Sequence, residues 1–114
     1  MLVSREFVFS SAHNLPRYRG KCENLHGHTY RLRITVEGEV DEEGLAFDFR
    51  ELKEIVNREI IQILDHTYLN EIISPPSCEN IALWIWEKLK GILPLKEVRV
   101  WESPDTFVTV REEK

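Results

Sequence analysis

Histidine is concentrated near the N-terminus of this chain, where His13, His26 and His28 are three of its four histidines. His26 and His28 lie two residues apart, and residues at this spacing in an extended strand point to the same face, about 6.5–7 Å apart. His13 can lie beside them if the first strand pairs with the second. Three neutral imidazoles suit Zn²⁺ and leave a fourth position for water or substrate. The spacing therefore predicts a metal site.

Two other interpretations fit the same spacing. A His-x-His pair also arises by chance at a surface, where it binds no metal. Alternatively Cys22, four residues before His26, is a fourth ligand that closes a structural zinc site. A third role for Cys22 is chemical, because its neighbours Arg19 and Lys21, or a metal, lower the pKa of a thiol and suit it to proton transfer or nucleophilic attack.

Two carboxylates have neighbours that matter for chemistry. Asp65 precedes His66, and a carboxylate beside an imidazole fixes its tautomer and raises its basicity. The same pair is ordinary at a helix C-terminus, where histidine meets the helix dipole favourably, and the residues alone favour that structural role. Glu102 interrupts an apolar strand, where a carboxylate can accept two parallel N–H bonds from a planar heterocycle. A solvent-facing glutamate is the alternative.

Two further segments are candidates for contact with a ligand. Ser77 can cap a second helix, and Cys78 directly after it is interpreted as a small residue of the capping turn. Arg17, Arg19 and Lys21 form a basic loop in a chain whose formal net charge is -5. Such a loop can meet the anionic tail of a substrate, with a solvated loop as the alternative.

Four strands are expected to position these residues. Leu2–His13 and Thr29–Val40 alternate between apolar and polar side chains, as half-buried strands do, and Asn14–Leu25 between them is an expected loop. Shorter strands are expected at Val98–Val100 and Phe107–Val110, joined near Ser103–Asp105.

Two helices are expected between the strand pairs. After a turn at Asp41–Gly44, Asp48 and Glu51 have the spacing of a capping box for a helix from about Phe49 to Leu64. A connection over Asp65–Ser77 follows. The second helix has an apolar face of Ile81, Ala82, Ile85 and Leu89, and it ends at Gly91 and Pro94.

The element order β-β-α-α-β-β indicates an α+β fold, with a four-stranded antiparallel sheet and two helices on one face. Residues 1–114 are expected to form one domain. The two sheet edges favour pairing with another subunit. An acidic chain with no apolar run of about 20 residues and no signal-peptide pattern is expected to bind neither nucleic acid nor membrane. Because the chain has only two cysteines, Cys22 and Cys78, we do not expect a disulfide scaffold, and we expect a cytoplasmic location.

Several motifs together resemble the 6-pyruvoyl-tetrahydropterin synthase and 6-carboxytetrahydropterin synthase family. The resemblance covers nearly the whole chain, and the combination is far more specific than any one piece. The motifs are Phe9-Ser-Ser-Ala-His13, Cys22-Glu-Asn-Leu-His26-Gly-His28, Leu64-Asp-His-Thr-Tyr-Leu-Asn70, Pro76-Ser-Cys-Glu-Asn-Ile-Ala82 and Trp101-Glu102.

The resemblance implies a tunnelling fold in which three subunits close their sheets into a barrel and two such trimers stack into a hexamer, with active sites between subunits. It also implies roles for the candidate residues. These are Zn²⁺ binding by His13, His26 and His28, proton transfer by Cys22 with help from Asp65 and His66, anchoring of a pterin ring by Glu102, and further ring contacts from Ser77 and Cys78.

The implied reaction converts 7,8-dihydroneopterin triphosphate to 6-carboxytetrahydropterin with release of acetaldehyde and triphosphate, as in 7-deazapurine (queuosine or archaeosine) biosynthesis. The short loop between His13 and Cys22 favours this carboxy-forming branch. Cys78 departs from the family, which usually has Ser or Thr there. A folate-related branch uses a glutamate in the role of the cysteine, and Glu23 directly follows Cys22. The alternatives are a 6-pyruvoyl-tetrahydropterin synthase and a non-catalytic, zinc-stabilised binding module.

Overall fold

One antiparallel sheet organises the computed structural model, which describes residues 1–17, 19 and 23–112. Its strands lie in the order β1 (Leu2–His13), β2 (His26–Glu37), β3 (Leu95–Ser103) and β4 (Thr106–Arg111). The two expected helices are present between β2 and β3, and the α+β prediction is confirmed. None of the helices in the described ranges is long and apolar enough to cross a membrane.

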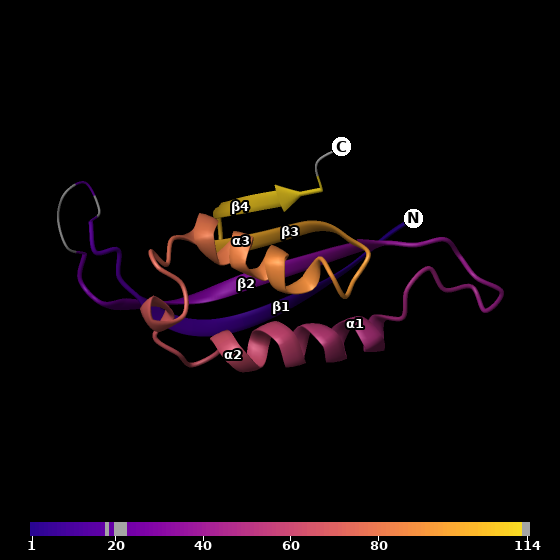
Figure 1. Ribbon diagram of the computed structural model, residues 1–114, viewed down its shortest axis with the longest axis horizontal. Coiled ribbons are helices and arrows are strands. Elements are labelled where there is room, and N and C mark those ends of the chain that lie inside the picture. Colours follow the sequence, from indigo (N-terminus) through magenta and orange to yellow (C-terminus); the bar gives the residue numbers. More distant parts are fainter. Residues whose placement is uncertain (18, 20–22, 113–114) are drawn as a thin grey trace.

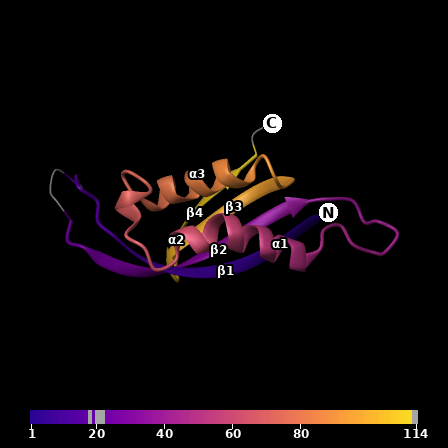
Figure 2. The same cartoon turned by 60° about the horizontal axis from the view of Figure 1, so that its bottom comes forward.

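Both helical segments cover the same face of the sheet. The first consists of α1 (Phe49–Val56), a π-helical stretch (Asn57–Ile61) and α2 (Gln62–Leu64), and together these match the predicted helix. It lies along β1, whereas α3 (Cys78–Leu89) lies over β3 and β4 (Figures 1 and 2). A 3-10 turn at Leu69–Glu71 falls within the connection between them.

The core lies between the sheet and these helices. Tyr30, Leu32, Ile34 and Val36 alternate along β2 and have no exposed surface, as expected of a strand with one covered face. The helices contribute matching apolar side chains, which are also fully buried: Leu52, Ile60, Ile81, Ala82, Ile85 and Leu89. His26 and His28 belong to the same alternating row of β2, so the covered face continues into the candidate site.

The predicted bounds of the second strand were wrong by three residues at each end. β2 begins at His26 instead of Thr29 because its pairing with β1 continues to the His13–His26 pair. It ends at Glu37 instead of Val40 because β1 begins at Leu2, its partner, and the Gly38 amide then donates to the Met1 carbonyl. The length of β1 thus sets both ends of β2.

Side-chain caps begin the two helices, as predicted. The Asp48 carboxylate accepts from the Arg50 amide at 2.8 Å, and the Ser77 hydroxyl accepts from the Asn80 amide at 3.1 Å. The expected turn at Asp41–Gly44 is closed by a bond from the Gly44 amide to the Asp41 carbonyl. The two caps therefore set the residues at which α1 and α3 begin.

Candidate functional site

Three imidazoles meet at the end of the β1–β2 pair. His13 and His26 are direct partners in the strand register, and His28 follows two residues along the same face. Their ligand nitrogens all lie within 4.8 Å of one another, and His13 is buried. The structure therefore brings together the three histidines that the spacing singled out.

Main-chain carbonyls orient two of these rings. His13 Nδ1 lies 2.8 Å from the Pro76 carbonyl, and His26 Nδ1 lies 2.7 Å from the Asn24 carbonyl. Because a carbonyl only accepts, each Nδ1 carries a proton, and Nε2 is the nitrogen of each ring that can bind a metal ion. A second partner of this kind is typical of metal-binding histidines.

The third ring, that of His28, makes no hydrogen bond through Nε2 to the described residues. Its Nε2 is buried, and burial without a hydrogen bond is costly for a polar atom. Burial lowers the pKa of His28, the nearby His13 and His26 lower it further, and Glu102 opposes the shift. The ring therefore stays neutral with its lone pair available. Three imidazole nitrogens that converge in this way are a donor set that fits Zn²⁺.

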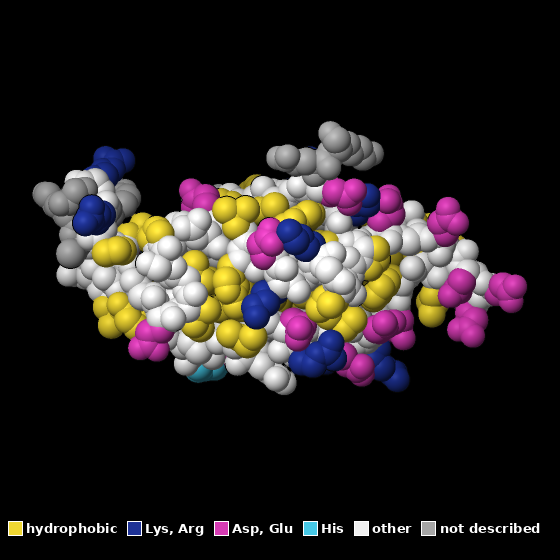
Figure 3. Space-filling model, in the orientation of Figure 1, with side chains coloured by type: hydrophobic (Ala, Val, Ile, Leu, Met, Phe, Trp, Pro, Cys, Tyr) yellow, Lys and Arg dark blue, Asp and Glu magenta, His cyan; other side chains and the backbone are white. Residues whose placement is uncertain are grey.

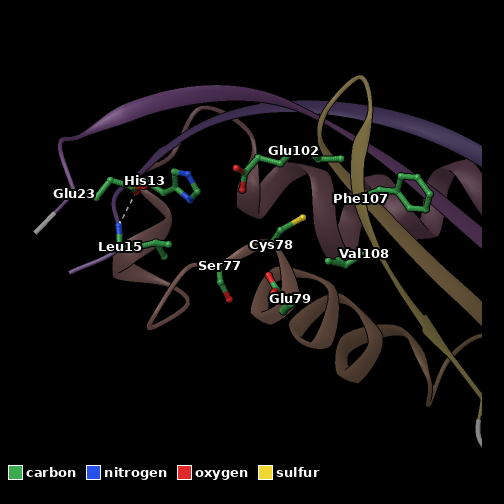
Figure 4. Close-up of a pocket in the computed structure, with 10 residues that line it drawn as sticks. His13, Leu15, Glu23, Ser77, Cys78, Glu79, Glu102, Phe107 and Val108 are labelled. Carbon is green, nitrogen blue, oxygen red and sulfur yellow. Dashed lines mark hydrogen bonds between the residues drawn. The ribbon is translucent and has the colours of Figure 1, made fainter. Parts of the chain in front are cut away.

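A cavity of about 360 Å³ opens beside His13. Glu102, Ser77 and Cys78 all line it, so the structure joins the three candidate ring contacts to a candidate metal ligand (Figure 4). Phe107 and Val108 of β4 add apolar surface. Clefts of this size, apolar with a few polar groups, are typical sites for small molecules.

Glu102 lies at an irregularity in the pairing of β3 with β4. It follows Val98 and Val100 on the covered face of β3, and the β3–β4 register shifts between Trp101 and Ser103. Such bulges re-aim a side chain and interrupt strand pairing. The Glu102 carboxylate, one third exposed, lies 3.6 Å from His28 Nε2 and points into the cavity (Figure 4).

The side chains of Ser77 and Cys78 are engaged within the protein. The Ser77 hydroxyl caps α3, and the Cys78 thiol donates to the Val100 carbonyl at 3.5 Å. Burial, with the charge of Glu102, raises the pKa of Cys78 to about 12. The thiol therefore stays protonated, and Cys78 contributes to this cavity as the first residue of α3.

Asp65 and His66 form a hydrogen-bonded pair tied to β1. Asp65 Oδ2 lies 2.9 Å from His66 Nδ1, and Asp65 Oδ1 accepts from the Ser10 amide at 2.9 Å. The Ser10 amide, and then His66, lower the pKa of Asp65. The His66 amide donates to the Ser10 carbonyl at 2.7 Å, which holds His66 at a φ of 57°. Such a φ is uncommon for a residue other than glycine.

His66 shares a cavity with one member of the histidine cluster. Its imidazole is 83% exposed, and His66 and His28 line one cavity of about 580 Å³. The helix-terminus interpretation of this pair does not account for the bonds to β1. The pair is positioned by tertiary contacts, and its imidazole lines a cavity together with the candidate ligand His28.

Of the neighbouring candidates Cys22 and Glu23, the structure describes only Glu23. Cys22 lies outside the described residues, so its candidate role stays a prediction. Glu23 lines the cavity of His13, accepts from the Leu15 amide at 3.0 Å, and has an oxygen 3.9 Å from His26 Nδ1. In the sequence, Glu23 stood out only because it directly follows Cys22, whose role a glutamate takes in a folate-related branch of the family.

Tyr30 was expected only as a core residue. Its hydroxyl lies 3.2 Å from His13 Nδ1, and its side chain is fully buried. The available signal was its spacing, since Tyr30 follows His28 by two residues and shares its face of β2. Phe107 and Val108 had no such signal, because only the β3–β4 pairing brings them to the cavity.

Comparisons with known proteins point to one family. The profile of the family described as 6-pyruvoyl tetrahydropterin synthase matches residues 2–113. A Synechocystis protein named 6-carboxy-5,6,7,8-tetrahydropterin synthase is 38% identical over 90% of this chain and 86% of its own. A Pyrococcus furiosus protein named dihydroneopterin monophosphate aldolase is 45% identical over 71% of this chain and 73% of its own.

A solved structure agrees with the sequence matches. The Caenorhabditis elegans 6-pyruvoyl tetrahydropterin synthase superimposes with a TM-score of 0.86 at 27% identity, over 99% of this chain and 96% of that one. The likeness therefore extends over nearly the whole chain.

Proposed function

Because the chain belongs to the 6-pyruvoyl tetrahydropterin synthase family, we propose that it is a 6-carboxy-5,6,7,8-tetrahydropterin synthase. In this reaction 7,8-dihydroneopterin triphosphate and one water yield 6-carboxytetrahydropterin, acetaldehyde and triphosphate. The observation that carries the proposal is the histidine cluster beside a cavity that also contains Glu102. The name of the Synechocystis relative supports the carboxy-forming outcome.

Glu102 is the proposed anchor of the pterin ring. The amino-pyrimidinone edge of a pterin presents two adjacent N–H groups, which a carboxylate can accept as two parallel bonds. The ring would lie against Phe107 and Val108 and beside the start of α3. Ser77 and Cys78 are the proposed further contacts there, and the engaged thiol of Cys78 favours its main chain as the contacting part.

His13, His26 and His28 are the proposed zinc ligands. When bound, Zn²⁺ supplies a Lewis acid that polarises the side-chain oxygens of the substrate and acidifies the adjacent C–H bonds. The carbonyls of Pro76 and Asn24 hold the Nδ1 protons and thereby fix which nitrogen of His13 and His26 is free.

Cys22, Asp65 and His66 are the proposed proton-transfer groups. Asp65 accepts from His66 Nδ1, which leaves His66 Nε2 to accept or release a proton. Because the His66 ring is largely exposed, it can exchange that proton with water. A positioned general base typically contributes about 10²–10⁴-fold to a reaction rate.

The proposal includes an assembly and a place in the cell. Three subunits would close their sheets into a barrel, two trimers would stack, and the working pockets would lie between subunits. The product would enter 7-deazapurine biosynthesis in the cytoplasm.

The deciding experiment is turnover of 7,8-dihydroneopterin triphosphate with the products identified by mass spectrometry. We expect 6-carboxytetrahydropterin and acetaldehyde. A second possible outcome is suggested by the name of the Caenorhabditis elegans structure, a 6-pyruvoyl tetrahydropterin synthase. If 6-pyruvoyl tetrahydropterin forms without the carboxy product, the chain has that synthase activity and our proposal is wrong. The Pyrococcus relative adds a third arm, in which dihydroneopterin monophosphate is cleaved and the triphosphate is not.

Replacing Cys22 separates an enzyme from a zinc-stabilised binding module. In Cys22→Ala we expect turnover to fall by about 10²-fold or more, as the loss of a proton-transfer group does, while zinc content and melting temperature stay those of the wild type. Zinc is measured by atomic emission and folding by circular dichroism. Loss of zinc or of the fold indicates a structural ligand, and full activity would defeat the catalytic assignment.

A further inference from the structure

A second cavity adjoins the one that holds His13 and Glu102. Its volume is about 380 Å³, and Arg17 and Arg19 line it. Leu15 and Ser77 line both cavities, so the two spaces meet along these residues. The arginines come from the loop that leaves β1 directly after His13.

Charge is divided between the two ends of the molecule. The described basic side chains of the β1–β2 loop, Arg17 and Arg19, lie at one end of the molecule, and Asp and Glu side chains gather at the far end, over the loop between β2 and α1 (Figure 3). Glu39, Asp41, Glu42 and Glu43 of that far loop are exposed. None of the described residues that line the second cavity is a carboxylate. Its described lining thus carries two arginines and no carboxylate, in a chain of net charge -5.

The order of groups along the first cavity gives the substrate a direction. Glu102 and Phe107 lie on one side of it, whereas His13 and Leu15 lie on the other (Figure 4). A substrate whose ring meets Glu102 and whose hydroxyls lie near His13 must continue past His13. Its terminal phosphates then extend toward Leu15 and the second cavity.

From this geometry we propose that Arg17 and Arg19 form the subsite that binds the phosphate chain of the substrate. The inference rests on the proposed function, since it takes the ring and hydroxyls to lie as described there. Guanidinium groups suit this task because their planar donors bind phosphate oxygens in pairs. Two such groups in a cavity beyond the reacting atoms select for the number of phosphates, favouring a triphosphate over a monophosphate.

The test compares the wild type with Arg17→Ala/Arg19→Ala. Inorganic triphosphate binding is measured by calorimetry, and KM and kcat are measured with 7,8-dihydroneopterin triphosphate. Unphosphorylated 7,8-dihydroneopterin serves as a competitive inhibitor that reports on ring binding alone. Arg58→Ala is the matched control, because Arg58 is an exposed arginine of the π-helical stretch that pairs with Glu59.

We expect the double variant to lose inorganic triphosphate binding and to raise KM by about 10-fold or more, since each charge-assisted contact with phosphate is worth roughly that factor. The inhibition constant of dihydroneopterin should change by less than about 3-fold, and kcat should change little, because the arginines lie away from the reacting atoms. Raised ionic strength should reproduce the KM effect in the wild type by screening.

Two results would overturn the subsite. The first is unchanged triphosphate binding and KM in the double variant, and the second is an equal loss of dihydroneopterin binding, which indicates damage to the ring site. Failure of the proposed function looks different, because the wild type would then not turn over the triphosphate at all. Calorimetry with inorganic triphosphate still decides the subsite in that case.

Discussion

The histidines and the cysteine described at this site differ in hydrogen bonding and in pKa because their surroundings differ. His28 has a lowered pKa and makes no hydrogen bond through Nε2 within the described chain, whereas His13 and His26 have their Nδ1 protons held by carbonyls. Cys78 is buried against Val100 with a raised pKa. The imidazoles can therefore donate lone pairs to a metal ion, whereas the Cys78 thiol is buried and stays protonated.

The thiol of Cys78 should resist thiol reagents in the folded protein. Its pKa of about 12 leaves almost no thiolate, which is the reactive form, and its side chain is buried. In Cys22→Ala, where Cys78 is the sole cysteine, we expect no reaction with Ellman's reagent at pH 8 until the protein is unfolded in guanidinium. Prompt labelling of the native protein would mean that Cys78 is accessible to substrate.

At the scale of elements, the β1–β2 pair has two parts with different surroundings. Along most of its length the covered face packs against the helices, and at one end the same face continues as the histidine cluster. The register that buries Tyr30 thus also places His28. The N-terminus of α3 completes the cavity, because the Ser77 cap starts that helix at Cys78.

The cap of α1 should matter for stability and not for chemistry. Asp48→Ala removes the bond to the Arg50 amide, and losing such a cap typically costs about 1 kcal/mol. Asp48→Asn is the matched control, since asparagine caps about as well. Chemical denaturation should show the difference, while kcat and KM of both variants stay those of the wild type. A fall in kcat in Asp48→Ala would connect α1 to the site.

For the whole molecule, one sheet face and two sheet edges lack covering elements in the single chain. No helix of the described chain lies on the face opposite α1 and α3, where Val8 is 64% exposed and Arg31 stacks on Trp101 at 3.7 Å. β1 and β4 are the edges. Long exposed edges favour pairing with further strands, which agrees with the proposed barrel.

We therefore expect activity to require assembly. Light scattering should give the mass of six chains at micromolar concentration, and specific activity should fall on dilution as that species dissociates. The physical reason is that pockets between subunits disappear with the interface. A monomer with undiminished specific activity would contradict both the hexamer and the shared pocket.

The sequence by itself determined the features that follow a local period or a short spacing. Alternation predicted which side chains of β2 are buried, the caps at Asp48 and Ser77 predicted the helix starts, and the His-x-His spacing predicted two convergent imidazoles. Each depends on backbone geometry within a few residues, so each can be read without knowing the fold.

The tertiary structure alone decided which distant groups meet. The Pro76 carbonyl orients His13, Ser10 holds Asp65, and Val100 engages Cys78, and no local pattern marks these partners. They depend on strand register, on the bulge at Glu102 and on the packing of α3 over β3. Those arise from the balance of contacts across the whole chain, which is why the sequence named the candidate residues while the fold assigned their partners.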